Sequence, residues 1–150
     1  MKAIAPPDLA TRPFRLNVER VMNASPEVLY GAWTEHIDRW FAAPGTLLIQ
    51  GKINTPFFFE VRHEGNRHPH YGRFLKLEPQ RLVELTWLTG AGGTKGAETV
   101  VTVALVPQDK GTLLRLTHAG FADAESRDGH EQAWPRVLQH LDQMMMAPQP

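Results

Sequence analysis

The segment from residue 46 to residue 119 constrains the fold most, because short apolar runs alternate in it with turn residues and no helical stripe occurs. Turn signals such as Glu64-Gly65-Asn66, Glu78-Pro79-Gln80 and Gly90–Gly96 separate these runs. Short strands broken at regular intervals by such turns are typical of an antiparallel meander. We therefore predict six strands in this segment: Thr46–Ile53, Phe57–His63, Tyr71–Leu77, Arg81–Thr89, Glu98–Val106 and Leu113–His118.

The residues before the meander predict one further strand and two short helices. Polar and apolar side chains alternate imperfectly over Phe14–Met22, which indicates a strand. Ser25 followed by Pro26 predicts a helix start, because a hydroxyl N-cap and a proline at the first helical position both favour one. A second short helix is expected after Thr34, with one face formed by Ile37, Trp40 and Phe41.

A long amphipathic helix is predicted from about Asp128 to Met146. Its apolar residues recur at helical spacing, namely Trp134, Val137, Leu138, Leu141, Met144 and Met145. The opposite face is expected to be polar, with Arg136, Gln139, His140, Asp142 and Gln143. Pro135 falls inside this segment, so we expect either a kink there or a helix that begins near Ala133.

These elements predict an α+β fold in which a twisted, seven-stranded antiparallel sheet is covered on one face by the C-terminal helix. A single domain is expected over residues 14–146, a length that suits one hydrophobic core. Residues 1–13, which contain three prolines, are predicted to be a flexible lead-in, and residues 147–150 a flexible tail.

Charge and cysteine content exclude several classes of function. The chain has 16 Lys and Arg against 16 Asp and Glu with no basic cluster, which argues against nucleic acid and against an anionic membrane surface. No apolar run is long enough for membrane insertion, and the N-terminus lacks the apolar core of a cleavable signal. With no cysteine there is no disulfide and no thiol nucleophile. We expect a cytoplasmic protein without a cofactor.

Strand alternation places one ionisable residue, His118, on an otherwise apolar inner face beside Leu114 and Leu116. Two interpretations stay open: a core histidine whose ring is satisfied by neighbouring groups, or the polar contact of a ligand cavity. His130 and Glu131 could reach the mouth of such a cavity, although a solvated first helical turn explains them equally well.

The histidine cluster around residue 68 and the glycine-rich segment Gly90–Gly96 are better interpreted as loops than as binding sites. His68-Pro69-His70, with His63 nearby, resembles a metal pair, but no carboxylate or cysteine at tight spacing completes it. A solvated loop is the better interpretation, and no metal is predicted. Gly90–Gly96 lacks the strand–loop–helix context of a phosphate site, so a flexible hairpin loop is expected.

Four motifs in order resemble one protein family. They are Ala24–Thr34 followed by Arg39-Trp40-Phe41, Gly72 leading to Leu77–Trp87, Gly111–Phe121, and Trp134 before Leu138 and Leu141. The chain resembles the START-like helix-grip superfamily (SRPBCC), and most closely bacterial homologues of the C-terminal domain of the heat-shock-protein-90 ATPase activator. The resemblance runs from about Phe14 to Met145. It departs from the family pattern at Ala133, where the family usually has glycine, and at Pro135.

The resemblance implies a strongly curved antiparallel sheet that grips the long C-terminal helix, with a hydrophobic cavity between them. Members mostly bind or process apolar small molecules, and this branch shares no set of catalytic residues. No catalytic residue is therefore assigned. The residues expected to line the cavity are Trp33, Trp40, Phe57, Phe59, Trp87, Leu114, Leu116, His118, Trp134, Leu138 and Leu141.

The leading hypothesis is the binding of a small hydrophobic or aromatic molecule in that cavity, with His118 as its polar contact. The first alternative is an enzyme, a cyclase, dehydratase or hydrolase, acting on an apolar substrate there. It requires a second ionisable group, for which Glu131, Glu60 and Arg73 are candidates. The second alternative is a chaperone-related or stress-response interaction module. A homodimer and a monomer both stay open.

Overall fold

A computed structural model describes residues 5–146 of the chain, which form an α+β fold around one sheet. Within this range the elements are β1 (Phe14–Met22), α1 (Pro26–Thr34), the 3-10 turn η1 (Ile37–Arg39), β2 (Pro56–His63), β3 (Asn66–Glu78), β4 (Leu82–Trp87), β5 (Thr99–Gln108), β6 (Gly111–Phe121) and α2 (Ala124–Met146). No helix in this range is both long and apolar enough to cross a membrane.

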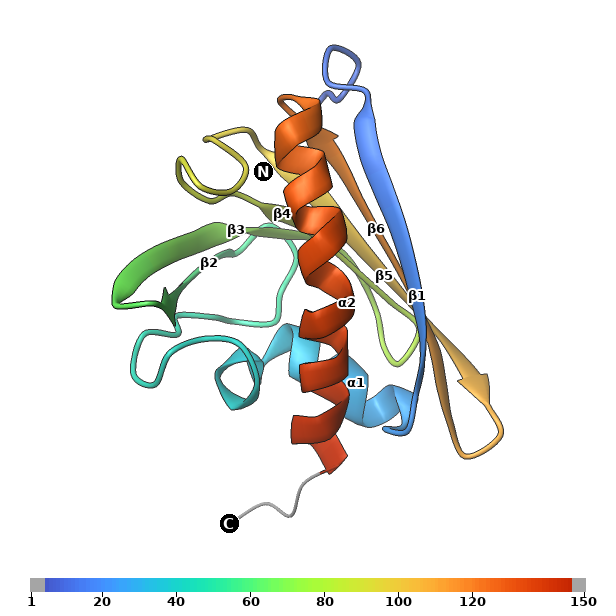
Figure 1. The fold of residues 1–150 in the computed structure, drawn as a ribbon. Coiled ribbons are helices and arrows are strands. Elements are labelled where there is room, and N and C mark those ends of the chain that lie inside the picture. Colours follow the sequence, from blue (N-terminus) through green and yellow to red (C-terminus); the bar gives the residue numbers. More distant parts are fainter. Residues whose placement is uncertain (1–4, 147–150) are drawn as a thin grey trace.

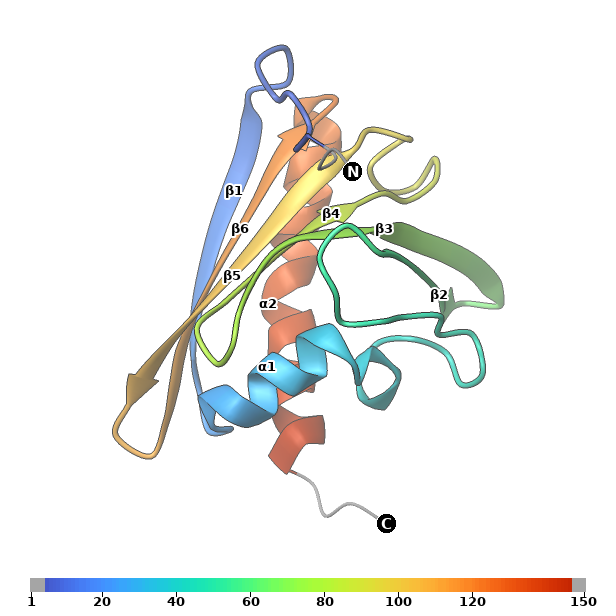
Figure 2. The ribbon, with the colours of Figure 1, turned by 180° about the vertical axis from the view of Figure 1, so that it is seen from behind.

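The sheet is antiparallel throughout, in the order β1-β6-β5-β4-β3-β2. The predicted meander is confirmed, since each strand from β2 to β6 pairs with the next, and β1 pairs with β6. The long helix α2 crosses one face of the sheet (Figure 1), and the view from behind shows α1 near the C-terminal half of α2 (Figure 2). The arrangement is consistent with the expected helix grip.

The prediction of seven strands was wrong, because the segment Thr46–Ile53 forms no strand among the described residues. It makes only isolated bridges, from Leu48 to Phe58 and from Ile53 to Phe74. Its apolar residues do not alternate, and Leu48 and Ile53 are 69% and 51% exposed. No face of this segment is buried deeply enough to hold it in a continuous ladder.

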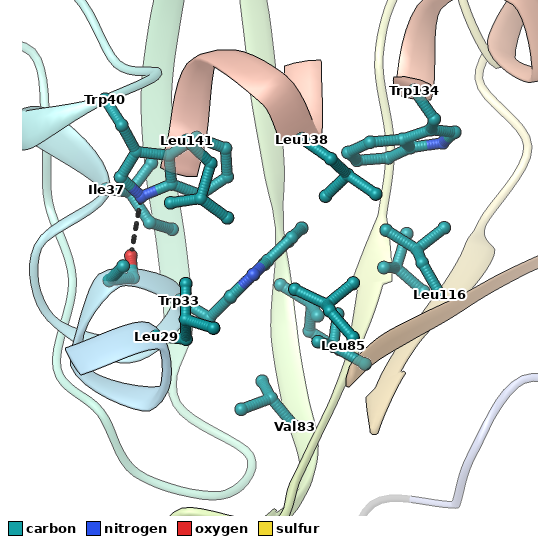
Figure 3. Close-up of a cluster of buried hydrophobic side chains, with 14 of the residues drawn as sticks. Leu29, Trp33, Ile37, Trp40, Val83, Leu85, Leu116, Trp134, Leu138 and Leu141 are labelled. Carbon is teal, nitrogen blue, oxygen red and sulfur yellow. Dashed lines mark hydrogen bonds between the residues drawn. The ribbon is translucent and has the colours of Figure 1, made fainter. Parts of the chain in front are cut away.

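Of the two short helices predicted after β1, the first is present and the second is not. Ser25 caps α1 as expected, with its hydroxyl accepting from Val28 N at 3.2 Å. The second segment is only the 3-10 turn η1. Its neighbour Trp40 donates from Nε1 to Ala32 O at 2.9 Å (Figure 3), so the chain turns back onto α1 instead of continuing as a helix.

Strand β3 begins at Asn66, five residues before the predicted strand. Pro69 is tolerated because this end of β3 pairs only with β2, so the amide hydrogen that proline lacks is not needed on the other side. Further along, Gly72 passes so close to Thr86 that a Cβ at this position would collide with the Thr86 carbonyl. The register of β3 against β4 shifts between Phe74 and Lys76, and an irregularity of this kind increases the local twist of a sheet.

Helix α2 starts at Ala124 and continues through Pro135, so a start near Ala133 was wrong. The side chain of Asp123 accepts from Ser126 N at 2.8 Å and caps the helix. The Ser126 hydroxyl also donates to Gly93 O in the loop between β4 and β5. These contacts hold the first turns of α2 in place, although Pro135 removes one backbone hydrogen bond from the helix.

The core lies between the inner face of the sheet and the two helices (Figure 3). Trp33 of α1 sits at its centre, fully buried, with ring centroids 5.0 Å from Trp40, 6.5 Å from Trp87 and 6.0 Å from Trp134. The aliphatic side chains around it come from α1, β4, β6 and α2. One compact aromatic cluster therefore joins α1, the sheet and α2.

Residues 5–13 form no helix or strand and lie against the outer face of the sheet. Arg12 fastens this segment, donating from Nε to Gly120 O at 2.7 Å and from Nη2 to Glu98 O at 2.8 Å. Whether this lead-in moves in solution stays a prediction. Residues 1–4 of the lead-in and residues 147–150 of the predicted tail lie outside the described range.

The prediction that Asp142 lies on a polar outer face of the last helix was wrong, because this residue is only 2% exposed. Its carboxylate accepts from Asn23 N at 3.0 Å, Asn23 Nδ2 at 3.0 Å and Ala24 N at 3.1 Å. These donors belong to the connection between β1 and α1. A buried carboxylate is tolerable when several donors satisfy it, and here it fastens that connection to α2.

We expect Asp142→Ala to lower the free energy of unfolding by about 3 kcal/mol, because it leaves three donors without their acceptor. Asp142→Asn keeps one oxygen and should cost less. Urea denaturation followed by circular dichroism measures both. The control Asp128→Ala removes an exposed carboxylate of the same helix and should change stability by less than about 0.5 kcal/mol. An equal loss in Asp142→Ala and the control would contradict this assignment.

Candidate functional site

A groove of about 910 Å³ runs between α2, the β2–β3 hairpin and the loop between β4 and β5. Its α2 side follows one helical face from Glu125 to Val137. The lining residues are Phe41, Val61, Arg62, His63, Arg67, His68, Pro69, His70, Trp87, Thr89, Gly90, Ala91, Gly92, Gly93, Lys95, Glu125, Ser126, Gly129, His130, Ala133, Trp134, Arg136 and Val137.

Aromatic rings form the deep wall of the groove. Trp87 of β4 lies 5.6 Å from Trp134 of α2 and 6.0 Å from Phe41, measured between ring centroids. Trp87 and Trp134 are 2% and 3% exposed, so each presents only a small part of its ring to the groove. Their flat, rigid surfaces suit a planar or aliphatic molecule.

The loop Gly90–Gly96 also borders the groove and is organised by its own hydrogen bonds. Thr94 N donates to Thr89 Oγ1 at 2.7 Å, and Thr89 N donates to Thr94 Oγ1 at 2.9 Å. Lys95 Nζ lies 2.9 Å from Asp123 and 2.8 Å from Glu125 at the start of α2. The loop is thereby attached to the helix, and the two define one side of the groove together.

His118 is fully buried and joins α2 to the sheet. Trp134 Nε1 donates to His118 Nδ1 at 3.1 Å, and His118 Nε2 lies 2.7 Å from Thr99 Oγ1. Because Nδ1 accepts, the ring proton is on Nε2, which donates to Thr99, and the Thr99 hydroxyl donates onward to Trp87 O. The ring is neutral, since burial, and next the nearby His130, lower the pKa of His118 well below its ordinary value.

Of the eleven residues expected to line a ligand cavity, Trp87 and Trp134 border the groove. Eight others lie behind the wall in the buried core: Trp33, Trp40, Phe57, Phe59, Leu114, Leu116, Leu138 and Leu141. His118 also lies behind the wall, with both ring nitrogens engaged by Thr99 and Trp134. Contact between any of these residues and a ligand stays a prediction.

Four histidines border the groove: His63, His68, His70 and His130. None was among the eleven residues predicted to line the cavity, although His130 was expected to be able to reach its mouth. His70 lies opposite Phe59 in the β2–β3 ladder, so the inward direction of Phe59 carries His70 inward as well. The turn that sets this register has a positive φ at both Glu64 and Gly65, as a two-residue type I′ hairpin requires. Counting outward from that turn could have placed His70 on the inner face.

Burial lowers the pKa of His70 and of His130. The pKa of His70 falls to about 4, chiefly through burial and secondarily through the charges of His130 and His68, against a hydrogen bond to His68 O that raises it. Burial likewise lowers the pKa of His130, opposed by its hydrogen bond to Ser126 O. Both rings are therefore neutral at pH 7.

The rim of the groove carries cationic side chains. Arg67 donates to Glu60 in a bidentate pair at 2.7 and 2.9 Å, and Lys95 is paired with Asp123 and Glu125. In the described part of the chain, neither Arg62 nor Arg136 has an ion-pair partner within 4.0 Å. Across residues 5–146, no three His, Asp or Glu side chains are arranged to hold a metal ion.

The three ionisable groups expected to assist an enzymatic His118 do not border the groove. Glu60 is held by Arg67, and Glu131 is exposed on α2. Arg73 donates from Nη1 to Asn54 Oδ1 at 3.0 Å and from Nη2 to Ala5 O at 2.5 Å, beside the N-terminal segment. An ionisable side chain that does lie close to His118 is His130, at 4.9 Å between ring centroids.

Comparison with known proteins identifies similar sequences and folds. The family described as Activator of Hsp90 ATPase homolog 1-like protein matches residues 23–146. A crystal structure from Chromobacterium violaceum is 22% identical, covers 91% of this chain and 100% of its own, and has a TM-score of 0.76. A Rhodobacter sphaeroides protein is 24% identical over 97% of this chain and 99% of its own, with a TM-score of 0.72.

The solution structure of the Aha1 dimer from Colwellia psychrerythraea is 19% identical to this chain. It covers 88% of this chain and 96% of its own, with a TM-score of 0.68. At these identities the likeness shows the fold alone. A search among curated proteins found no match.

Because the pKa values of His70, His118 and His130 are lowered, we expect mild acid to destabilise the folded protein before its carboxylates become protonated. In the unfolded chain each histidine takes up a proton near pH 6.5, whereas the folded chain does not. The free energy of unfolding therefore falls as the pH decreases below 6.5, with up to about 1.4 kcal/mol per pH unit from each histidine. For His70 the window extends down to about pH 4.

Urea denaturation at pH 7.5, 6.0 and 5.0 measures this slope. We expect His70→Phe, which keeps an aromatic ring, to make the loss between pH 6.0 and 5.0 smaller by roughly 1 kcal/mol. A hydrogen bond from Arg67 lowers the pKa of Glu60 below 4.5, and a hydrogen bond from Lys95 lowers the pKa of Asp123 below 3.8. Protonation of these carboxylates therefore affects stability only at a pH below this range. The exposed control His140→Phe should keep the wild-type slope. Stability that is constant from pH 7.5 to 5.0 would contradict the prediction.

Proposed function

Because the chain belongs to the family of Activator of Hsp90 ATPase homolog 1-like proteins, we propose that it binds a small hydrophobic or aromatic molecule between the sheet and α2. The observation that supports this function is the groove of about 910 Å³ with Trp87, Trp134 and Phe41 in its wall. Small-molecule sites usually have volumes of about 300–1,000 Å³, apolar walls and a few polar groups. The groove has a volume in this range and aromatic rings in its deep wall, while histidines and charged side chains line the rest of it.

The residues predicted to line the cavity take two roles in this proposal. Trp87 and Trp134 contact the ligand directly. The eight buried residues behind them keep these two rings in place, and His118 fixes the Trp134 indole through its hydrogen bond. A ring held by packing and a hydrogen bond loses little freedom when a ligand binds, so less of the binding free energy is offset by ordering.

An enzyme is the second candidate function, and the groove histidines favour it. His70 and His130 are neutral, and a neutral imidazole at a groove surface is suited to general-base chemistry. In that function, the imidazole of His70 or His130 would accept a proton from an acidic C–H or O–H bond of a substrate bound beside it. Loss of turnover with retained binding in His70→Phe or His130→Phe would separate this function from simple binding.

A homodimer is a further part of the proposal. The Colwellia psychrerythraea protein of the same fold is described as a dimer in solution. Sedimentation of this chain over a range of concentrations tests whether it associates likewise.

We expect a ligand of the proposed class to raise Tm. Binding to the folded state alone at 100 times Kd stabilises it by about 2.7 kcal/mol, or roughly 5–10 °C for a chain of this length. A thermal-shift screen of lipids, aromatic compounds and polyketide-like compounds measures this effect. Native mass spectrometry of the purified protein tests for a ligand carried through purification. A complete screen without a shift, together with an unliganded mass, would contradict the proposal.

The variant Gly129→Leu locates the site without destabilising the fold. Gly129 borders the groove, and a Cβ there meets no atom within 4 Å. Leucine favours a helix over glycine by about 0.8 kcal/mol, so Tm without ligand should stay unchanged or rise. Its side chain should fill part of the groove and abolish the ligand-induced shift. The control Gln132→Leu lies on the same helix outside the groove and should keep the shift.

A further inference from the structure

Two of the four histidines that border the groove, His70 and His130, each have one ring nitrogen engaged by their own chain. His70 Nδ1 lies 3.0 Å from His68 O, and His130 Nδ1 lies 2.8 Å from Ser126 O. A carbonyl oxygen only accepts, so the proton of each neutral ring is on Nδ1. Nε2 is therefore a hydrogen-bond acceptor in both residues. In the described part of the chain, neither Nε2 atom has a hydrogen-bond partner.

Packing fixes the direction of both rings. His70 stacks on Phe59 at 5.1 Å with an interplanar angle of 14°, and its edge meets Trp87 at 5.2 Å and Phe41 at 5.4 Å. His130 lies 5.0 Å from Phe121 and 4.9 Å from His118. One ring belongs to β3 and the other to α2, so the two acceptors come from different sides of the groove.

Rigid, uncharged acceptors distinguish among ligands by hydrogen bonding. His70 and His130 are half-buried, and neither Nε2 is among the fully buried unpartnered atoms of the described residues. A ligand donor that replaces the solvent at such an acceptor restores its hydrogen bond, whereas an analogue without the donor displaces the solvent and leaves the acceptor unsatisfied. Both rings are neutral at pH 7 and accordingly attract no anion by charge. The charged groups that face them are Arg62, Arg67, Lys95 and Arg136 on the rim, with Glu125 beside Lys95.

We propose that the groove selects planar, apolar ligands with hydroxyl groups, which donate hydrogen bonds to Nε2 of His70 and Nε2 of His130. This inference rests on the proposed binding function and names the chemistry that the site recognises. The aromatic wall binds the apolar framework, and the imidazoles distinguish a hydroxylated compound from its ether or hydrocarbon analogue.

Calorimetric titration of the full chain at pH 7.5 with matched naphthalenes tests the proposal. The probes are 2,6-dihydroxynaphthalene, 2,6-dimethoxynaphthalene and naphthalene-2,6-dicarboxylate. We expect the diol to bind roughly tenfold more tightly than the dimethyl ether, since the ether cannot donate. His70→Phe keeps the aromatic stack but removes the acceptor, and should weaken diol binding roughly five- to tenfold while leaving ether binding unchanged.

His130→Phe provides a second, independent variant on α2, and the exposed His140→Phe is its matched control. The control should bind the diol as wild type does. Circular dichroism establishes that each variant is folded before titration.

Three results would overturn the inference. Equal affinity for diol and ether, unchanged in both histidine variants, would leave the proposed function standing but remove the hydrogen-bond selection. Tightest binding of the dicarboxylate, weakened by Arg62→Gln or Arg136→Gln, would identify an anion site at the rim instead. Absence of binding by all three naphthalenes in wild type would overturn the inference, and it would count against the proposed function as well only if the thermal-shift screen also finds no ligand.

Discussion

The hydrogen bonds that join α2 to the sheet through His118 determine how the rest of the molecule is arranged. Trp134 donates to His118, His118 donates to Thr99, and Thr99 donates to the Trp87 carbonyl. One chain of polar groups thus connects α2 with β6, β5 and β4 in the middle of an apolar core. Each polar atom in this chain has a partner, so its burial costs little, and any shift of α2 would break at least one bond.

Two further attachments fix α2 at its ends. Ser126 and the loop Gly90–Gly96 hold the N-terminal turns, and Asp142 holds the C-terminal half against the connection between β1 and α1. The β2–β3 hairpin projects beyond these attachments (Figure 1) and does not close onto the N-terminal half of α2, and the groove lies in the remaining space. The same contacts that stabilise the helix therefore position the wall that a ligand would meet.

Local patterns predicted most of the fold from the sequence. Alternation placed β1 at its observed bounds, and turn residues separated β2 to β6 correctly. The failures arose where tertiary contacts decide. Asp142 has the spacing of a solvent-facing residue, yet donors from Asn23 and Ala24, more than a hundred residues earlier, draw it into the interior. Thr46–Ile53 has the composition of a strand, but it makes only isolated bridges, to Phe58 at the outer edge of β2 and to Phe74, and forms no continuous ladder.

The same distinction separates the two kinds of histidine in the site. The position of His70 follows from a local rule, because a two-residue turn at Glu64 and Gly65 sets the register that puts it opposite Phe59. The hydrogen-bond partners of His118 come from β5 and α2, so no pattern in the sequence around His118 predicts them. A buried histidine that is fully satisfied by distant elements holds the structure together. A histidine that borders a groove and has a hydrogen-bond partner at only one ring nitrogen keeps the other nitrogen as an acceptor for a ligand.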